Sequence, residues 1–131
     1  MDRIAEGARL RRQVVGAEYV DPGDKLAAES PFFKNFLDFT VEHCWGNVWV
    51  RPGLSHKTRS MLNLAMLSVL GHWPEFRIHT RGALNNGVTE EEIAEILLQA
   101  GVYAGVPVAA EGFKAAKAVI DEYRKTTPAA K

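Results

Sequence analysis

The strongest local signal in this 131-residue chain is a helix N-terminus at Thr89. Thr89 and Glu92 have the spacing of a capping box, in which each side chain accepts a hydrogen bond from the other's backbone amide. Val88 and Ile93 flank the box with the spacing of a hydrophobic staple. Other helix starts and stops recur along the chain, whereas no segment shows the convincing alternation of a strand. The sequence therefore predicts an all-α fold.

About six helices are expected, each bounded by a recognisable start or stop. Ser30-Pro31 combines an N-cap serine with proline at the first helical position, and Pro74 starts a later helix. The turn sequence Asp21-Pro22-Gly23-Asp24 predicts a loop over residues 17–29. Helices are expected at about 2–15, 30–44, 55–70, 74–85, 89–100 and 108–123. The central helix, 55–70, is expected to be buried through an apolar face of Leu54, Thr58, Met61, Leu62, Ala65 and Val69, which Leu64 and Leu67 widen.

The length suits one compact domain over residues 1–131, with a helix and loop at 1–29 and a frayed tail at 126–131. The 16 Lys and Arg residues balance the 16 Asp and Glu residues, so no general attraction to nucleic acid or anionic membranes is expected. The charged first dozen residues do not read as a signal peptide, and no apolar stretch is long enough to span a bilayer. A cytoplasmic protein is predicted.

Cys44 is the only cysteine of the chain. A lone thiol forms no internal disulfide, which excludes a disulfide-stapled secreted domain and an intramolecular dithiol redox cycle. Such a residue is usually a small apolar side chain, and no special role is predicted for it.

His72, Glu75 and His79 form the most chemically suggestive group. Offsets of three and four place Glu75 and His79 one above the other on a helix, with His72 just before it. A carboxylate and an imidazole in a water-poor site can exchange protons near neutral pH. The same spacing also suits a surface pair or a hydrogen bond satisfied in the core. In a third interpretation, the three residues are ligands of a metal ion. No further Asp, Glu or Cys obviously completes the coordination shell, so no metal is predicted.

A connector carries Trp45, Trp49 and Arg51 beside Pro52 and Gly53. The two rings suit an apolar wall, and the guanidinium suits a substrate carboxylate. The alternative is that the tryptophans are core or subunit-interface anchors and that Arg51 pairs with an acidic residue. Tyr103 also has two interpretations. Its hydroxyl could lie in a pocket, or its ring could belong to the core with one edge in contact with water.

Two blocks, WGNVWVRPGL from Trp45 and HTRGALNNGVT from His79, closely resemble the carboxymuconolactone decarboxylase family. The likeness covers roughly residues 5–121 and includes the opening segment RRQVVGAEYVD. It implies an all-α subunit that assembles into rings, as a homohexamer built as a trimer of dimers or as a homotrimer. A polar first helix and a surplus of apolar helix faces fit such self-association.

The family has a redox branch with Cys-x-x-Cys followed by His, and a decarboxylase branch that keeps Glu and His. His72 and Glu75 stand at the two cysteine positions here, and His79 stands at the histidine. The resemblance therefore implies no thiol peroxidase activity and a catalytic role for Glu75 and His79.

The implied reaction is loss of carbon dioxide from 4-carboxymuconolactone, which gives 3-oxoadipate enol-lactone in aromatic catabolism and needs no cofactor. Arg51 is expected to bind a substrate carboxylate, with Trp45 and Trp49 excluding water and His72 contacting substrate. His79 or Tyr103 is expected to stabilise the oxyanion, and Glu75 or His79 to deliver the proton.

Two departures from the family pattern keep other readings open. Ala104 and Ala110 stand where the decarboxylases usually have Cys and Asn. The chain could therefore be a paralogue that acts on another lactone or β-oxo acid, or a non-catalytic oligomeric binding protein.

Overall fold

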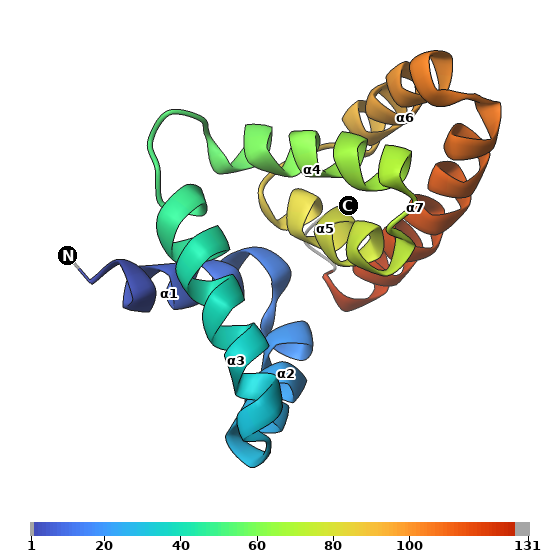
Figure 1. The fold of residues 1–131 in the computed structure, drawn as a ribbon. Helices are drawn as coiled ribbons and strands as arrows, with labels where there is room; N and C mark the ends of the chain where they lie inside the picture. The colour runs from blue at the N-terminus through green and yellow to red at the C-terminus, as the bar shows by residue number, and fades with distance from the viewer. Residues whose placement is uncertain (1, 128–131) are drawn as a thin grey trace. The chain divides into compact units, whose positions relative to one another are not determined.

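The computed structural model describes residues 2–127, and Figure 1 shows that they form helices joined by short connections. No strand occurs in this part of the chain, so the predicted all-α class is confirmed. The elements are α1 (Arg3–Val15), α2 (Ala17–Glu29), α3 (Pro31–Phe39), the π-helix η1 (Thr40–Trp49), α4 (His56–Leu70), α5 (Trp73–Asn85), α6 (Glu90–Ala104) and α7 (Val106–Thr126). They divide into two compact units, Met1–His56 and Lys57–Lys131. The single domain predicted for residues 1–131 stays a prediction.

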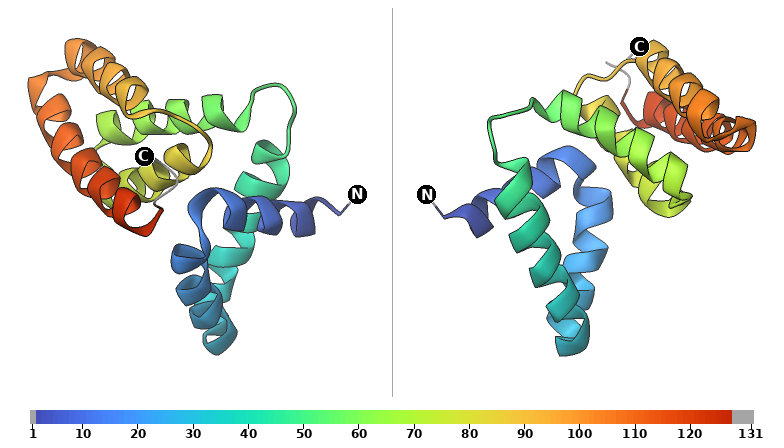
Figure 2. Two further views of the ribbon diagram at one scale, coloured as in Figure 1. Left: turned by 180° about the vertical axis from the view of Figure 1, so that it is seen from behind. Right: turned by 45° about the horizontal axis from the view of Figure 1, so that its top comes forward.

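The first unit consists of α1, α2, α3 and η1. α1 crosses η1, and α2 lies alongside α3 (Figure 2). Trp45 and Trp49 of η1 stack at 4.7 Å between ring centroids and are 4% and 3% exposed. Buried aromatic rings of this size contribute strongly to a small core, so these two residues anchor the first unit.

The predicted loop at residues 17–29 is wrong, because this segment is α2. Two ion pairs connect it to α1: Arg11 contacts Asp24 at 3.1 Å, and Arg12 contacts Asp21 at 2.8 Å. Gly23 leaves room for the Arg11 guanidinium, since a Cβ there would lie 3.3 Å from it. Tertiary contacts thus overcome the helix-breaking tendency of Pro22 and Gly23.

The helix expected to end near Cys44 also continues further than predicted. Ser30 caps α3 by accepting a hydrogen bond from the Phe33 amide at 3.2 Å, as the sequence suggested. The backbone stays helical through Phe39 and enters η1, which ends at Trp49. Burial of Trp45 and Trp49 on one side explains why Gly46 does not end the helix. The prediction of about six helices is therefore too low for the described residues, which hold seven α-helices and η1.

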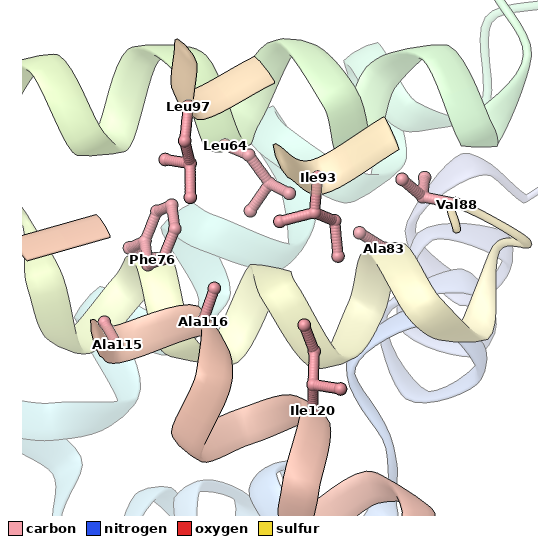
Figure 3. Packing of buried hydrophobic residues seen from close by; sticks show 9 residues of the cluster. All are labelled: Leu64, Phe76, Ala83, Val88, Ile93, Leu97, Ala115, Ala116 and Ile120. Atoms are coloured by element: carbon pink, nitrogen blue, oxygen red, sulfur yellow. The ribbon is translucent and has the colours of Figure 1, made fainter. Parts of the chain in front are cut away.

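The second unit contains α4 to α7 around one hydrophobic core, shown in Figure 3. Leu64 of α4, Phe76 of α5 and Leu97 of α6 are each fully buried there. α7 packs against both α5 and α6 and adds small side chains at Ala115 and Ala116. This core holds α4 and α5 rigidly enough to position side chains that lie between them.

The helix boundaries predicted in the second unit agree well with the structure. Both hydrogen bonds of the capping box are present, with Thr89 Oγ1 accepting from Glu92 N at 3.1 Å and Glu92 Oε1 accepting from Thr89 N at 2.9 Å. Val88 and Ile93 are both buried. α7 is longer than expected and includes Thr126, where the frayed tail was predicted to begin; residues 128–131 lie outside the described part.

The expected burial of the central helix is confirmed for only part of its apolar face. Leu64 is fully buried, and Met61 and Leu67 are partly buried against the same core, whereas Leu62 and Val69 are 46% and 49% exposed. The periodicity located the apolar face correctly, but no helix within the second unit covers all of it. None of the described helices is long and apolar enough to cross a membrane.

Candidate active site

His79 lies on α5 with its ring directed toward α4. Its Nδ1 atom is 3.3 Å from Nδ2 of Asn63, which is partly buried on α4. The next residue on α5, Thr80, is fully buried and bonds its hydroxyl to the Phe76 carbonyl at 2.7 Å. His79 therefore sits at the edge of the core, with one ring nitrogen against a polar group.

Two opposing effects set the charge of His79. Burial lowers the pKa of His79 to about 4, and the negative charge of Glu75 opposes this shift but is smaller. Desolvation disfavours the charged form of a base, which explains the direction. The imidazole is therefore neutral at pH 7 and can act as a hydrogen-bond donor through one nitrogen and an acceptor through the other.

Glu75 and His72 occupy the first part of the same helix. Glu75 is exposed in the first turn of α5, one turn before His79, where a carboxylate also interacts favourably with the helix dipole. His72 is the N-cap residue of α5; its side chain makes no capping hydrogen bond and is exposed. The helix thus brings Glu75 and His79 together as expected from their spacing, with His72 at its start.

Arg51, Trp45 and Trp49 belong to the first unit. Arg51 follows the end of η1 and is exposed, and its amide donates to the Val48 carbonyl at 3.0 Å. Trp49 also contacts the ring of His56, with 5.9 Å between centroids. These contacts fix the backbone from which Arg51 projects.

Tyr103 lies near the end of α6 and is 84% exposed. It lines a groove of about 640 Å³ between α4 and α6, together with Leu62, Ala65, Val69 and Ile96. Neither Glu75 nor His79 is among the residues that line this groove. Within the second unit, Tyr103 is therefore not placed in a common pocket with the Glu75–His79 pair.

The environment of Cys44 affects the reactivity of its thiol. Desolvation raises the pKa of the Cys44 thiol, with a hydrogen bond from Trp49 acting in the opposite direction. A raised pKa leaves less thiolate, the reactive form.

Among residues 2–127, no group of three or more His, Cys, Asp or Glu side chains is arranged to hold a metal ion.

Asn63 is the residue of this site that the sequence reasoning missed. It interrupts the apolar stretch from Met61 to Leu70, so its polarity was visible. Only the packing of α4 against α5 shows that it meets His79, which is 16 positions further along the chain.

The model of the carboxymuconolactone decarboxylase family matches residues 34–118, which include Glu75, His79 and Asn63. This match covers more than half of the chain, and the chain therefore belongs to the carboxymuconolactone decarboxylase family.

Two relatives match most of the sequence. Nitrosuccinic acid decarboxylase from Metarhizium robertsii is 42% identical over 89% of this chain and 80% of its own length. 4-Carboxymuconolactone decarboxylase from Acinetobacter baylyi is 39% identical over 80% of this chain and 77% of its own length. Both relatives are decarboxylases, and the chain is accordingly assigned to this class of enzyme.

Proposed function

We propose that this protein is a cofactor-free carboxy-lyase whose preferred substrate is 4-carboxymuconolactone. The observation that carries the proposal is the neutral, desolvated imidazole of His79, held against Asn63 one turn after Glu75. A neutral imidazole N–H in a water-poor site is well suited to stabilise an oxyanion, because the hydrogen bond gains strength as charge develops on the acceptor.

The chemistry requires an electron sink in the substrate. The bond between the ring carbon and its carboxylate breaks, carbon dioxide leaves, and the electron pair moves through the alkene onto the lactone carbonyl oxygen. One proton must then be added to the ring carbon next to that carbonyl, which gives the enol-lactone. The protein must therefore orient the substrate, stabilise the dienolate oxygen and supply one proton.

In this proposal His79 donates a hydrogen bond to the dienolate oxygen. This assignment favours His79 over Tyr103, because Tyr103 lines a separate groove. Since His79 is neutral, the proton for carbon is assigned to Glu75, which obtains it from water.

Arg51 is assigned to the carboxylate that stays on the substrate. A guanidinium can bind a carboxylate through two parallel hydrogen bonds, which fixes orientation as well as charge. Trp45 and Trp49 expose little surface, so their contribution is support for the segment that carries Arg51. His72 is assigned to a substrate contact at the entrance to α5.

Nitrosuccinic acid is the second candidate substrate, because the relative named for it is 42% identical over 89% of the chain. Its nitro group can accept the electron pair released with carbon dioxide, which forms a nitronate. The nitronate oxygens are then the oxyanion, and protonation at carbon completes the reaction. His79 and Glu75 would have the same roles with both substrates. The two substrates would differ in how well they fit the residues around Ala104 and Ala110.

Self-association as a homohexamer or homotrimer belongs to the proposal as well. The apolar groove between α4 and α6, lined by Leu62, Val69 and Ile96, supports it, because monomers rarely leave large apolar patches uncovered. A cytoplasmic location completes the proposal.

The test measures carbon dioxide release from freshly generated 4-carboxymuconolactone and from nitrosuccinic acid in parallel. Wild-type protein is expected to release carbon dioxide rapidly from 4-carboxymuconolactone. Glu75→Gln and His79→Ala are each expected to reduce kcat by about 100-fold or more, the usual scale for a general acid or an oxyanion donor. Turnover of nitrosuccinic acid alone would favour the second candidate. Folded, oligomeric wild-type protein inactive on both substrates would refute the proposal.

A further inference from the structure

Asn63 is a polar side chain in an apolar stretch of α4, and it has a specific partner. Its amide nitrogen lies 3.3 Å from His79 Nδ1, and both residues are partly buried. Burying an amide is unfavourable unless its groups are hydrogen-bonded, so a residue at this place is expected to contribute through its contact.

The direction of this hydrogen bond determines which imidazole nitrogen carries the proton. An amide NH₂ can only donate, so Nδ1 of a neutral imidazole must accept with its lone pair. The proton then resides on Nε2, the ring nitrogen directed away from Asn63. Had the amide oxygen faced the ring, Nδ1 would carry the proton and Nε2 would present a lone pair.

We propose that Asn63 is a positioning residue that holds His79 as the Nε2–H tautomer and so presents an N–H donor to the oxyanion formed on decarboxylation. The tautomer is inferred from the Asn63–His79 contact and does not rest on the proposed function. Its catalytic consequence rests on the proposed function. A lone pair at Nε2 would repel the developing oxyanion, so the wrong tautomer would oppose the reaction.

The surroundings of the ring are consistent with a neutral imidazole. Glu75 is the charged group on α5 whose field reaches His79, and its effect is smaller than that of desolvation. On α4, Arg59 precedes Asn63 by one helical turn. α6 and α7 contribute aliphatic side chains to the core beneath α5. Asn63 therefore orients the ring without adding a charge to it.

The tautomer can be measured directly by long-range ¹H–¹⁵N correlation spectra of histidine-labelled protein, since protonated and unprotonated ring nitrogens resonate far apart. Wild-type His79 is expected to show an unprotonated Nδ1 and a protonated Nε2 at pH 7. At a pH above the raised pKa of His79 in the variant, Asn63→Asp is expected to reverse this pattern, because a carboxylate accepts from Nδ1–H. A wild-type Nδ1–H, or an unchanged pattern in Asn63→Asp, would overturn the proposal.

A matched control separates this effect from general weakening of the α4–α5 contact. Ser60 of α4 accepts a hydrogen bond at 3.0 Å from Asn86, which follows α5. Ser60→Ala removes this second link between the same helices and is expected to leave the His79 nitrogen resonances in place. Asn63→Leu is expected to move them toward an average of the two tautomers. Equal shifts in Ser60→Ala and Asn63→Leu would contradict a specific role for Asn63.

Kinetics test the catalytic consequence on whichever substrate the wild-type protein decarboxylates. Asn63→Leu is expected to lower kcat by about ten- to a hundredfold with little change in KM, the scale found for outer partners of functional histidines. In Asn63→Asp, kcat is expected to fall as pH rises through the raised pKa of His79, because the imidazolium donates from Nε2 but the neutral Nδ1–H form does not. Ser60→Ala is expected to retain the wild-type profile.

The two proposals fail in distinguishable ways. If the wild-type protein decarboxylates neither substrate, the proposed function fails, while the nitrogen resonances still decide the tautomer. If the protein decarboxylates a substrate but Asn63→Asp keeps the wild-type pH profile, the catalytic role of Asn63 is refuted and the proposed function stands.

Discussion

Gly7 of α1 and Gly46 of η1 lie backbone to backbone where the two helices cross. A Cβ on Gly7 would overlap with the main chain of Gly46, and a Cβ on Gly46 would lie 2.8 Å from the carbonyl oxygen of Arg3. The first unit therefore depends on the absence of side chains at this crossing, which brings α1 close to the stacked Trp45 and Trp49.

Gly7→Ala is expected to lower the free energy of unfolding by about 1–3 kcal/mol, the usual cost of overpacking where the backbone must shift. Urea denaturation followed by tryptophan fluorescence measures this change. Gly53→Ala is a suitable control, since a Cβ there would meet nothing within 4 Å. Equal stability of Gly7→Ala and wild type would show that α1 does not pack on η1 in this way.

The partly buried, neutral His79 makes the stability of the protein depend on pH. The pKa of His79 is about 4 in the folded protein, chiefly because of desolvation, against 6.5 for an unperturbed histidine. Between these values the unfolded chain binds a proton that the folded protein does not. Stability is therefore retained above about pH 6.5 and is lost as pH falls toward 4, by up to about 3 kcal/mol.

Denaturation curves of wild type and His79→Gln at pH 7.5, 6 and 4.5 test this expectation. Glutamine does not titrate, so the variant is expected to lose less stability on acidification than wild type. The other histidines are present in both proteins and cancel in the comparison. Parallel losses in the two proteins would mean that His79 titrates normally in the folded state.

The capping box at Thr89 allows a sharper stability prediction. Thr89→Ala removes the side chain that accepts from the Glu92 amide, and the expected loss is about 1 kcal/mol. Thr89→Ser keeps the hydroxyl and is expected to stay within a few tenths of a kcal/mol of wild type. Chemical denaturation at pH 7 measures both. Similar losses in both variants would indicate that the methyl group, rather than the cap, is important.

The backbone amide of Thr89, with a smaller contribution from Lys57, also lowers the pKa of the Glu92 carboxyl. The stabilisation from this group is therefore present above its ordinary pKa and is lost as pH falls through the lowered value.

Local sequence patterns predicted the second unit better than the first. The capping box and the glycines that follow helices are short-range signals, and α4, α5 and α6 begin and end close to where these signals indicated. α2 could not be found in this way. It buries Val20 and Ala27, and its Asp21 and Asp24 pair with Arg12 and Arg11 of α1, so it is stabilised by contacts between separate helices.

The same distinction applies to the candidate site. Glu75 and His79 could be predicted as a pair because they are four residues apart on one helix. Asn63 comes from another helix, and only the shared core around Leu64 and Phe76 brings it to His79. Likewise, spacing identified the apolar face of α4 but carried no information on what covers it.

Cys44→Ser tests the proposal that no thiol chemistry is involved. The raised pKa of Cys44 disfavours the reactive thiolate, so decarboxylase activity is expected to be within about twofold of wild type. Loss of activity with unchanged thermal stability would give Cys44 a role that the proposed mechanism does not include.

The apolar face of α4 leads to a prediction about assembly. Leu62 lines the groove between α4 and α6 and is 46% exposed, so a charge placed there would be solvated in a monomer but desolvated in a subunit interface. Leu62→Glu is therefore expected to shift the protein to smaller species while leaving the helical content unchanged. Sedimentation velocity at several concentrations measures the mass, and Lys114→Glu on the exposed surface of α7 is the control. A Leu62→Glu variant with the wild-type mass would exclude this face from the interface, and a monomeric wild-type protein would refute the proposed assembly itself.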